Sequence, residues 1–148
     1  LIQAAIVFDQ TPEKTWDILY RTETQVHYLE EIDTIRVIDK SKTEDRLEFK
    51  LSVMLITKIY RVIHVFDKKN RYIHWSLDKS FDRNDLEELR GFWRFYPYGE
   101  GKTLARYGSN VSIKYVPEFI ENMFKKSGVK KALEAVRKYV NSGGTYRK

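Results

Sequence analysis

The sequence predicts an α+β fold in which a curved antiparallel β-sheet wraps around a long C-terminal α-helix, with two short helices after the first strand. Three observations predict it. Hydrophobic and polar residues alternate through much of the middle of the chain, which is the period of strands with one buried face. Hydrophobic residues recur at helical spacing over 117–141. The length of 148 residues is usual for one domain, so we expect 1–148 to form a single domain.

The N-terminal part predicts a strand followed by the two short helices. Residues 2–8 form a β-prone run. Thr11 and Pro12 then mark a helix start, because Thr is a good N-cap and Pro fits the first helical turn. Apolar residues around Trp16 give this helix its buried side, and a second short helix is predicted over 24–31.

The middle of the chain predicts a meander of six strands. The clearest strand contains Leu47, Phe49 and Leu51, which alternate with Glu48 and Lys50. Short polar connections make successive strands antiparallel neighbours. Several runs exceed the usual ~5–6 residues, and such long strands twist and coil, so the sheet should curve. The predicted strands cover 35–38, 47–55, 58–66, 72–78, 89–96 and 102–113.

The last element predicted is the long helix over 117–141, which starts at Pro117 and is interrupted at Ser127 and Gly128. At ~1.5 Å per residue it would be roughly 37 Å long. That length would carry it across the whole concave face of the sheet.

Composition excludes several classes of protein. With no cysteine, the chain has no disulfide, no thiolate metal site and no cysteine nucleophile. No run approaches the ~20 apolar residues of a membrane-spanning helix, so we expect a soluble protein. The sequence starts at Leu1 and not at Met, which leaves the compartment open: cytoplasmic, or periplasmic if a signal peptide has been removed.

The net charge of +6 comes entirely from the C-terminal part of the chain. Residues 1–113 hold 18 basic and 18 acidic side chains, whereas 114–148 hold 9 and 3. No groove-reading or base-stacking module accompanies this charge, so nucleic acid is not an expected partner. The basic cluster contains Lys125, Lys126, Lys130 and Lys131. It is either the solvated side of an amphipathic helix or a docking surface for an anionic membrane.

Four segments in this order carry a family resemblance: DQTPEKTW at 9–16, GFWRF at 91–95, GEGKT at 99–103 and PEFI at 117–120. With the order of elements, they make the chain resemble the START-like helix-grip superfamily, also called SRPBCC. This superfamily includes polyketide cyclases, coenzyme-Q-binding proteins and the birch-pollen-allergen fold. The resemblance covers nearly the whole chain, and it implies a hydrophobic cavity between the sheet and the long helix. The short helices and nearby hairpins would form the entrance.

Alternation along the strands predicts which side chains face that cavity. Within 91–95, Trp93 and Phe95 share a face opposite to Arg94, which cannot face a dry core. The alternative is that the same residues pack tightly against the helix and leave no void. The predicted cavity residues are Phe49, Leu51, Val53, Ile73, Trp75, Trp93, Phe95, Tyr107, Phe119, Met123 and Phe124.

Three further residues are candidates for polar groups in the pocket: His64, His74 and Arg106. His64 and His74 lie on successive predicted strands, where they could form an acid/base or metal pair. No His-x-His or His-Glu-x-x-His spacing supports a metal site, and no nucleophile elbow, phosphate loop or dinucleotide motif is present. No catalytic residue and no metal ligand is therefore assigned, and no cofactor is expected.

The leading hypothesis is that a monomer binds and transports a hydrophobic small molecule, such as a lipid, isoprenoid, quinone or polyketide, without catalysis. The first alternative is an enzyme of the cyclase or dehydratase type, with His74, Tyr107 or Arg106 orienting a reactive chain. The second is a protein-interaction module with a filled core. A cavity below the ~300 Å³ typical of small-molecule sites would count against the leading hypothesis.

Overall fold

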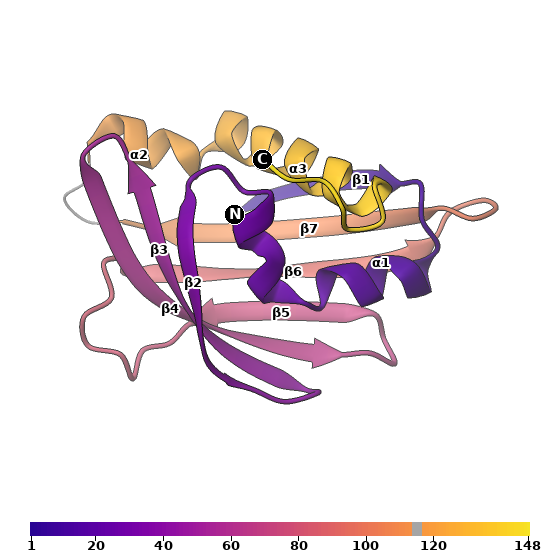
Figure 1. The fold of residues 1–148 in the computed structure, drawn as a ribbon, viewed down its shortest axis with the longest axis horizontal. Helices are drawn as coiled ribbons and strands as arrows, with labels where there is room; N and C mark the ends of the chain where they lie inside the picture. The colour runs from indigo at the N-terminus through magenta and orange to yellow at the C-terminus, as the bar shows by residue number, and fades with distance from the viewer. Residues whose placement is uncertain (114–116) are drawn as a thin grey trace.

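The computed structural model of the chain describes residues 1–113 and 117–148, and its centre is one antiparallel sheet. Seven strands lie in the order β1-β7-β6-β5-β4-β3-β2, so the last six form an uninterrupted meander (Figure 1). The strands are β1 (Ile2–Phe8), β2 (Ile32–Lys40), β3 (Glu44–Val53), β4 (Ile56–Asp67), β5 (Tyr72–Leu77), β6 (Glu88–Pro97) and β7 (Thr103–Ser112). The helices are α1 (Pro12–Leu19), the 3-10 helix η1 (Thr22–His27), α2 (Glu118–Met123) and α3 (Lys126–Asn141).

The helices lie along one side of the curved sheet. In Figure 1, α2 and α3 run above β7 and β6, and β3 and β4 rise toward α2. The predicted α+β fold with its curved antiparallel sheet, short helices and C-terminal helix is confirmed. No helix in residues 1–113 or 117–148 is long and apolar enough to cross a membrane.

The first helix starts where the sequence predicts it. The Oγ1 atom of Thr11 accepts a hydrogen bond from the backbone N–H of Lys14 at 3.2 Å, and Pro12 occupies the first turn. The second element differs from the predicted helix over 24–31. It is a 3-10 helix that ends at His27, and this shorter form is common in brief connecting segments.

The C-terminal helix also differs from its prediction, because it breaks two residues earlier than expected. Lys125 has an extended backbone, with φ −84° and ψ 173°, and separates α2 from α3. Ser127 and Gly128 lie in the first turn of α3, where the backbone N–H groups have no partners within the helix in any case. A glycine there weakens the helix little, so the break falls before it.

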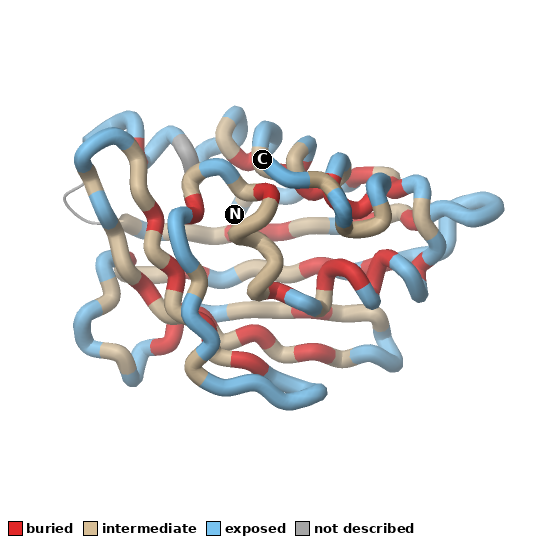
Figure 2. The backbone as a smooth tube through the Cα atoms, viewed as in Figure 1, coloured by how far each residue is buried: buried red, intermediate tan, exposed pale blue. Residues whose placement is uncertain are grey.

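Alternating side chains give the sheet an inner and an outer face. On β3, Leu47, Phe49 and Leu51 are buried, whereas Glu48 and Lys50 between them are partly exposed. Figure 2 shows the same alternation of buried and less buried positions along the strands. The helices cover the inner face.

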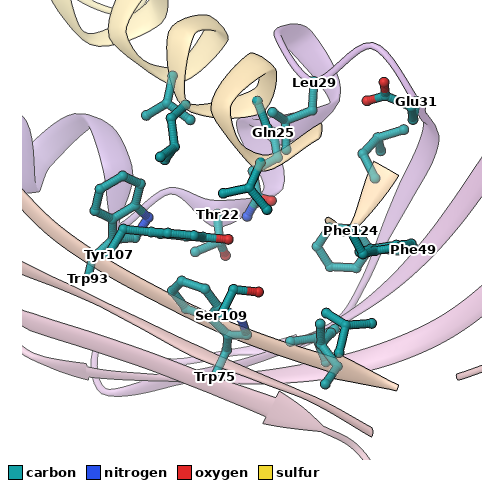
Figure 3. A pocket seen from close by; sticks show the side chains of 18 of the residues that line it. Thr22, Gln25, Leu29, Glu31, Phe49, Trp75, Trp93, Tyr107, Ser109 and Phe124 are labelled. Carbon is teal, nitrogen blue, oxygen red and sulfur yellow. The ribbon is translucent and has the colours of Figure 1, made fainter. Parts of the chain in front are cut away.

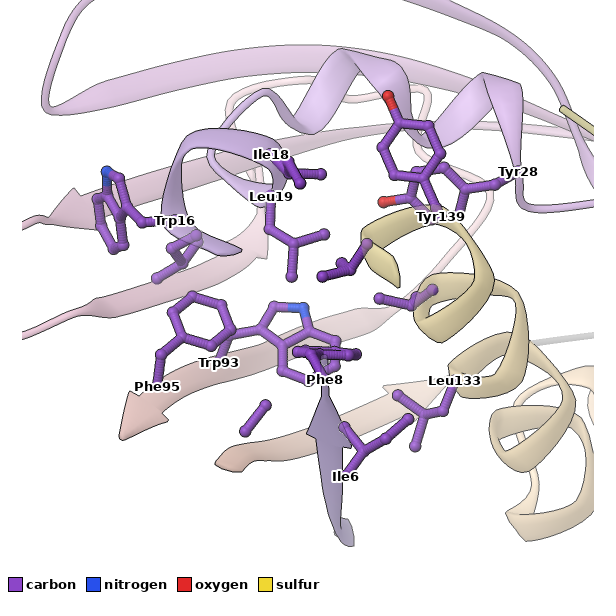
Figure 4. Close-up of a cluster of buried hydrophobic side chains, with 14 of the residues drawn as sticks. Ile6, Phe8, Trp16, Ile18, Leu19, Tyr28, Trp93, Phe95, Leu133 and Tyr139 are labelled. Carbon is purple, nitrogen blue, oxygen red and sulfur yellow. The ribbon is translucent and has the colours of Figure 1, made fainter. Parts of the chain in front are cut away.

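Buried residues form two clusters on the inner face. The first lies beneath α1 and the C-terminal half of α3, where Phe8, Trp16, Trp93 and Phe95 pack with Val140 (Figure 4). The second lies over β2, β3, β4 and the adjoining ends of β5 and β6, and it includes Phe49, Tyr60 and Leu77. Trp75 packs against both clusters and therefore joins them.

The indole ring of Trp75 packs over Gly91 on the adjacent strand, because a glycine leaves room for it there. Trp75 and Gly91 are register partners on β5 and β6. A Cβ atom at Gly91 would lie 2.4 Å from Cζ2 of Trp75 and 2.5 Å from the carbonyl oxygen of Gly108. Any larger residue at this position must displace the indole or the neighbouring strand.

We therefore expect Gly91→Ala to lower the free energy of unfolding by about 1–3 kcal/mol, the usual cost of overpacking. Urea denaturation followed by circular dichroism measures this change. Ser76→Ala, an exposed substitution on the adjacent strand, serves as the control and should change stability by less than about 0.5 kcal/mol. Equal stability of the wild type and Gly91→Ala would contradict the expected clash.

Candidate functional site

A cavity of about 190 Å³ lies between the inner face of the sheet, η1 and the part of α3 up to Val136 (Figure 3). Most of its wall is aliphatic or aromatic. From the helices and the segments that follow them, the wall receives Leu19, Thr22, Gln25, Tyr28, Leu29, Glu31, Phe124, Gly128, Val129, Ala132, Leu133 and Val136. From the strands it receives Ile32, Phe49, Leu51, Tyr60, Val62, His64, Ile73, Trp75, Leu89, Trp93, Tyr107, Ser109 and Val111.

The volume of the cavity limits what it can hold. About 190 Å³ is below the ~300 Å³ set as the lower bound for the predicted binding site, and this counts against ligands of drug or lipid size. The space is nevertheless larger than an apolar cavity of ~150 Å³ that takes up benzene in another protein. A molecule of one or two rings, or a short branched chain, matches this space.

Aromatic rings form much of the floor. The ring of Tyr107 lies 4.9 Å from that of Trp93 and 5.9 Å from that of Trp75, between their centroids. Phe49 and Tyr60 stack at 5.4 Å on the adjoining strands. Such surfaces favour flat, apolar partners, because aromatic pairs gain about 0.5–1.5 kcal/mol beyond the area that they bury.

Several of the predicted residues lie on this wall, most of them from the inward-facing positions of the strands. They come from β3, β4, β5, β6, β7 and the α2–α3 junction. These residues are Phe49, Leu51, His64, Ile73, Trp75, Trp93, Tyr107 and Phe124.

Three predicted residues lie elsewhere. Val53 is the last residue of β3, at the end of its strand. Phe95 points inward but packs beside Trp16 in the filled first cluster, at the other end of the sheet. Phe119 is 39% exposed on α2. The side chain of Met123, also predicted, lies outside the part of the chain that the structure describes.

The predicted pairing of His64 with His74 does not form. His74 is the register partner of Val65, and His64 is the partner of Trp75, so the two imidazoles lie on opposite faces of the sheet. His74 stacks instead on Tyr72 at 4.9 Å. Arg106 is also exposed on the outer face. Within residues 1–113 and 117–148, no three His, Asp or Glu side chains gather to hold a metal ion.

Sequence reasoning missed the polar groups that η1 and β3 bring to the cavity. Gln25 and Glu31 line it from the segment before β2. Asp45 lies behind the wall, fully buried, and its Oδ1 is 2.7 Å from Nδ1 of His64. Its other oxygen accepts a hydrogen bond from the Thr22 hydroxyl. The alternation of Asp45 with Leu47 and Phe49 was the signal that could have placed it inside.

The phenols around the cavity remain protonated well above neutral pH. Burial raises the pKa of Tyr60 far above its ordinary value of 10.0, and nearby Tyr107 and Glu31 add to the shift. Burial also raises the pKa of Tyr107, although its hydrogen bond with Ser109 partly opposes this. Both side chains are therefore neutral hydroxyl groups that can donate or accept hydrogen bonds.

The four lysines of the basic cluster are exposed, as expected for the outer side of an amphipathic helix. The Nζ of Lys125 lies 3.7 Å from a carboxylate oxygen of Glu121, and that of Lys131 lies 3.4 Å from one of Glu30. Lys126 and Lys130 have no ion pair within the described residues. The cluster adjoins the cavity, because Phe124 and Gly128 on its wall lie in the same stretch of chain.

Comparison with solved structures finds several chains of the same architecture. A START superfamily protein from Mycobacterium smegmatis superposes with a TM-score of 0.75 at 13% identity, covering 95% of this chain and 97% of that one. A STAR-related lipid transfer protein from Xanthomonas axonopodis gives a TM-score of 0.73 at 9% identity, covering 93% and 84%. The Zhui aromatase/cyclase from a Streptomyces species gives 0.66 at 10% identity, covering 96% and 86%.

These likenesses confirm the predicted START-like resemblance and establish the fold of this chain as helix-grip. At identities of 13% or lower, they establish the fold alone. No family model and no curated protein sequence matches the chain.

The raised pKa of Tyr60 predicts a loss of stability at alkaline pH. The unfolded chain releases the Tyr60 proton near pH 10, whereas the folded protein keeps it, so the contribution is complete below pH 10 and falls as the pH rises further. Tyr60→Phe should flatten this fall by up to about 1.4 kcal/mol per pH unit. Urea denaturation between about pH 9 and 11 measures the slope. Tyr98→Phe, at a half-exposed position, is the control and should leave the slope unchanged; equal slopes for both variants would refute the prediction.

Proposed function

We propose that this chain binds a small hydrophobic molecule in the cavity between its sheet and α3, and that it carries the molecule without transforming it. The observation that supports this most directly is the mostly apolar cavity of about 190 Å³ between the sheet and α3. Burial of apolar ligand surface, at ~25 cal/mol per Å², would drive binding.

A cavity of this size is unusual beneath a packed helix. Interiors normally leave few voids larger than a water molecule. A fold that keeps such a space lined by side chains such as Trp75, Trp93 and Leu133 gains stability when an apolar molecule fills it.

The size and lining favour the smaller members of the predicted ligand classes. A flat molecule of one or two rings, or a short isoprenoid, fits the volume, whereas a two-chain lipid does not. The stacked rings of Phe49 and Tyr60 and the rings of Trp75 and Tyr107 favour an aromatic ligand.

The structural neighbours support the same proposal. One is named as a lipid transfer protein and another as an aromatase/cyclase. Of the residues on which the cyclase alternative depended, His74 and Arg106 lie on the outer face and only Tyr107 lines the cavity. The second alternative, an interaction module with a filled core, requires tight packing where the cavity lies.

The proposal predicts that a neutral two-ring probe binds and that filling the cavity abolishes binding. Naphthalene should bind the wild type with one site in isothermal titration calorimetry. Ala132→Phe places a ring in the cavity from α3 and should weaken binding at least tenfold, equal to about 1.4 kcal/mol. Native mass spectrometry of gently purified protein should also show a retained lipophilic mass.

Glu134→Phe is the matched control, because it adds the same ring to an exposed position on the same helix. It should bind naphthalene like the wild type. If naphthalene does not bind the wild type, or if it binds both variants equally well, the cavity is not the binding site.

We also propose that the basic cluster docks this binding protein on an anionic membrane. Lys126 and Lys130 face solvent beside the cavity. Met54 and Leu55, at the turn between β3 and β4, are almost wholly exposed apolar side chains. Anionic headgroups attract lysines by ~1 kcal/mol each near the surface, and exposed apolar tips add contact with the interface.

Charge reversal tests this docking. Lys126→Glu combined with Lys130→Glu should reduce sedimentation with phosphatidylserine vesicles at least tenfold, and binding by the wild type should fall with added salt. Lys68→Glu combined with Lys69→Glu reverses two exposed charges at the β4–β5 turn and should sediment like the wild type. Equal sedimentation with phosphatidylcholine and phosphatidylserine vesicles would exclude docking by charge.

A further inference from the structure

A buried pair of polar side chains lies at the cavity wall. Asp45 on β3 and His64 on β4 are register partners, and Nδ1 of the imidazole is 2.7 Å from Oδ1 of the carboxylate. Asp45 is fully buried, and His64 is 3% exposed. The Thr22 hydroxyl donates to Oδ2 of Asp45, and Nζ of Lys40 is 3.9 Å from the same oxygen. The carboxylate is thus held from three sides.

This arrangement fixes the hydrogen on one nitrogen of the imidazole. A carboxylate only accepts hydrogen bonds, so the hydrogen between the two groups belongs to Nδ1 of His64. In a neutral imidazole the other nitrogen, Nε2, then carries a lone pair and accepts. The Thr22 and Lys40 contacts keep the carboxylate in place, and the carboxylate keeps the ring in this form.

The accepting nitrogen has no hydrogen-bond partner in the part of the chain that the structure describes. His64 lines the cavity, and its Nε2, which has no hydrogen bond among the described residues, is not sealed from solvent, so the edge away from Nδ1 reaches the cavity. In residues 1–113 and 117–148, no side chain or backbone group forms a hydrogen bond with Nε2. The imidazole ring is surrounded by the rings of Phe49, Phe66 and Trp75, whose centroids lie 6.0 to 6.4 Å from its own centroid. A hydrogen-bond acceptor therefore stands in aromatic surroundings without a donor.

We propose that the ligand of this cavity is a small aromatic or enolic molecule whose hydroxyl group donates a hydrogen bond to Nε2 of His64. This inference rests on the proposed binding function and adds the chemical group that is recognised. The rings of Phe49 and Trp75 flank the hydroxyl site and suit a flat ligand body. Glu31 lines the cavity, and none of its lining residues in 1–113 and 117–148 is a lysine or arginine, so a neutral hydroxyl suits the site better than a carboxylate does.

A pair of probes that differ only in one hydroxyl group tests the proposal. Naphthalene and β-naphthol have the same two rings. Without a partner, the hydroxyl would weaken binding, because a polar group loses its hydrogen bonds with water on burial. With Nε2 as its acceptor, β-naphthol should bind the wild type about five- to tenfold more tightly than naphthalene does. Isothermal titration calorimetry measures both dissociation constants.

Two variants test whether a preference for β-naphthol over naphthalene depends on Asp45 and His64. His64→Phe keeps a flat ring but removes the acceptor, so the variant should bind naphthalene at least as well as β-naphthol. Asp45→Asn offers an amide N–H to Nδ1, which moves the imidazole hydrogen to Nε2 and turns the acceptor into a donor. This variant should lose the preference for β-naphthol and gain affinity for β-tetralone, whose carbonyl accepts.

His74→Phe is the matched control, because it makes the same substitution on the outer face of the sheet. It should keep the wild-type preference. Circular dichroism shows which variants fold, and the comparison of the two probes on the wild type needs no variant at all.

The outcomes separate this inference from the proposed function. If neither probe binds the wild type, the binding function fails and the inference fails with it. If both bind and naphthalene binds as tightly as β-naphthol, the cavity binds apolar molecules but His64 does not select a hydroxyl. A preference that survives in folded His64→Phe would likewise overturn the inference.

Discussion

The apolar inner face of the sheet is the constraint on which the rest of this fold depends. Seven antiparallel strands present one continuous inner face, and burial of its side chains requires a cover. The main cover is α3, whose 16 residues extend about 24 Å at ~1.5 Å per residue. A helix of that length covers only part of a face built from strands of up to 12 residues. The rest of the inner face is covered by α1, η1 and the short α2.

The two ends of α3 meet this constraint differently. Toward its C-terminus, Tyr139 and Val140 pack against α1 and β1 in the first buried cluster, which large aromatic side chains fill. Toward its N-terminus, Gly128 and Ala132 line the cavity, and the lack of a side chain at Gly128 and the single methyl group of Ala132 leave space below the helix. Larger residues of the same helix, such as Leu133, line the cavity as well and also belong to the first cluster.

The sequence predicted most of the strands because a period of two runs through β3 and β4, and it was weaker at β2, whose burial does not alternate, and where structure depends on distant contacts. Alternation through Leu47, Phe49 and Leu51 assigned the inner face correctly, and the same pattern explains why His74, between Ile73 and Trp75, faces outward. Alternation could not show that Phe95 packs on Trp16 whereas Trp93 also reaches the cavity. The alternating pattern determines which face of the sheet a residue lies on, but not where along the sheet it lies. The helix break at Lys125 has no strong local signal. Whether space remained under the helix depended on packing between segments far apart in the chain.

The buried polar groups follow from the same geometry. A strand pair with an apolar inner face can bury a carboxylate only if each oxygen is satisfied, and Asp45 meets this condition through His64 on the adjacent strand and Thr22 on η1. The network therefore ties η1, one side of the cavity, to the sheet. It also settles the orientation of the imidazole, because the edge bound to Asp45 cannot turn toward the cavity without leaving a buried carboxylate oxygen unpaired. A polar contact that holds the wall together thus also determines which edge of the His64 ring faces the cavity.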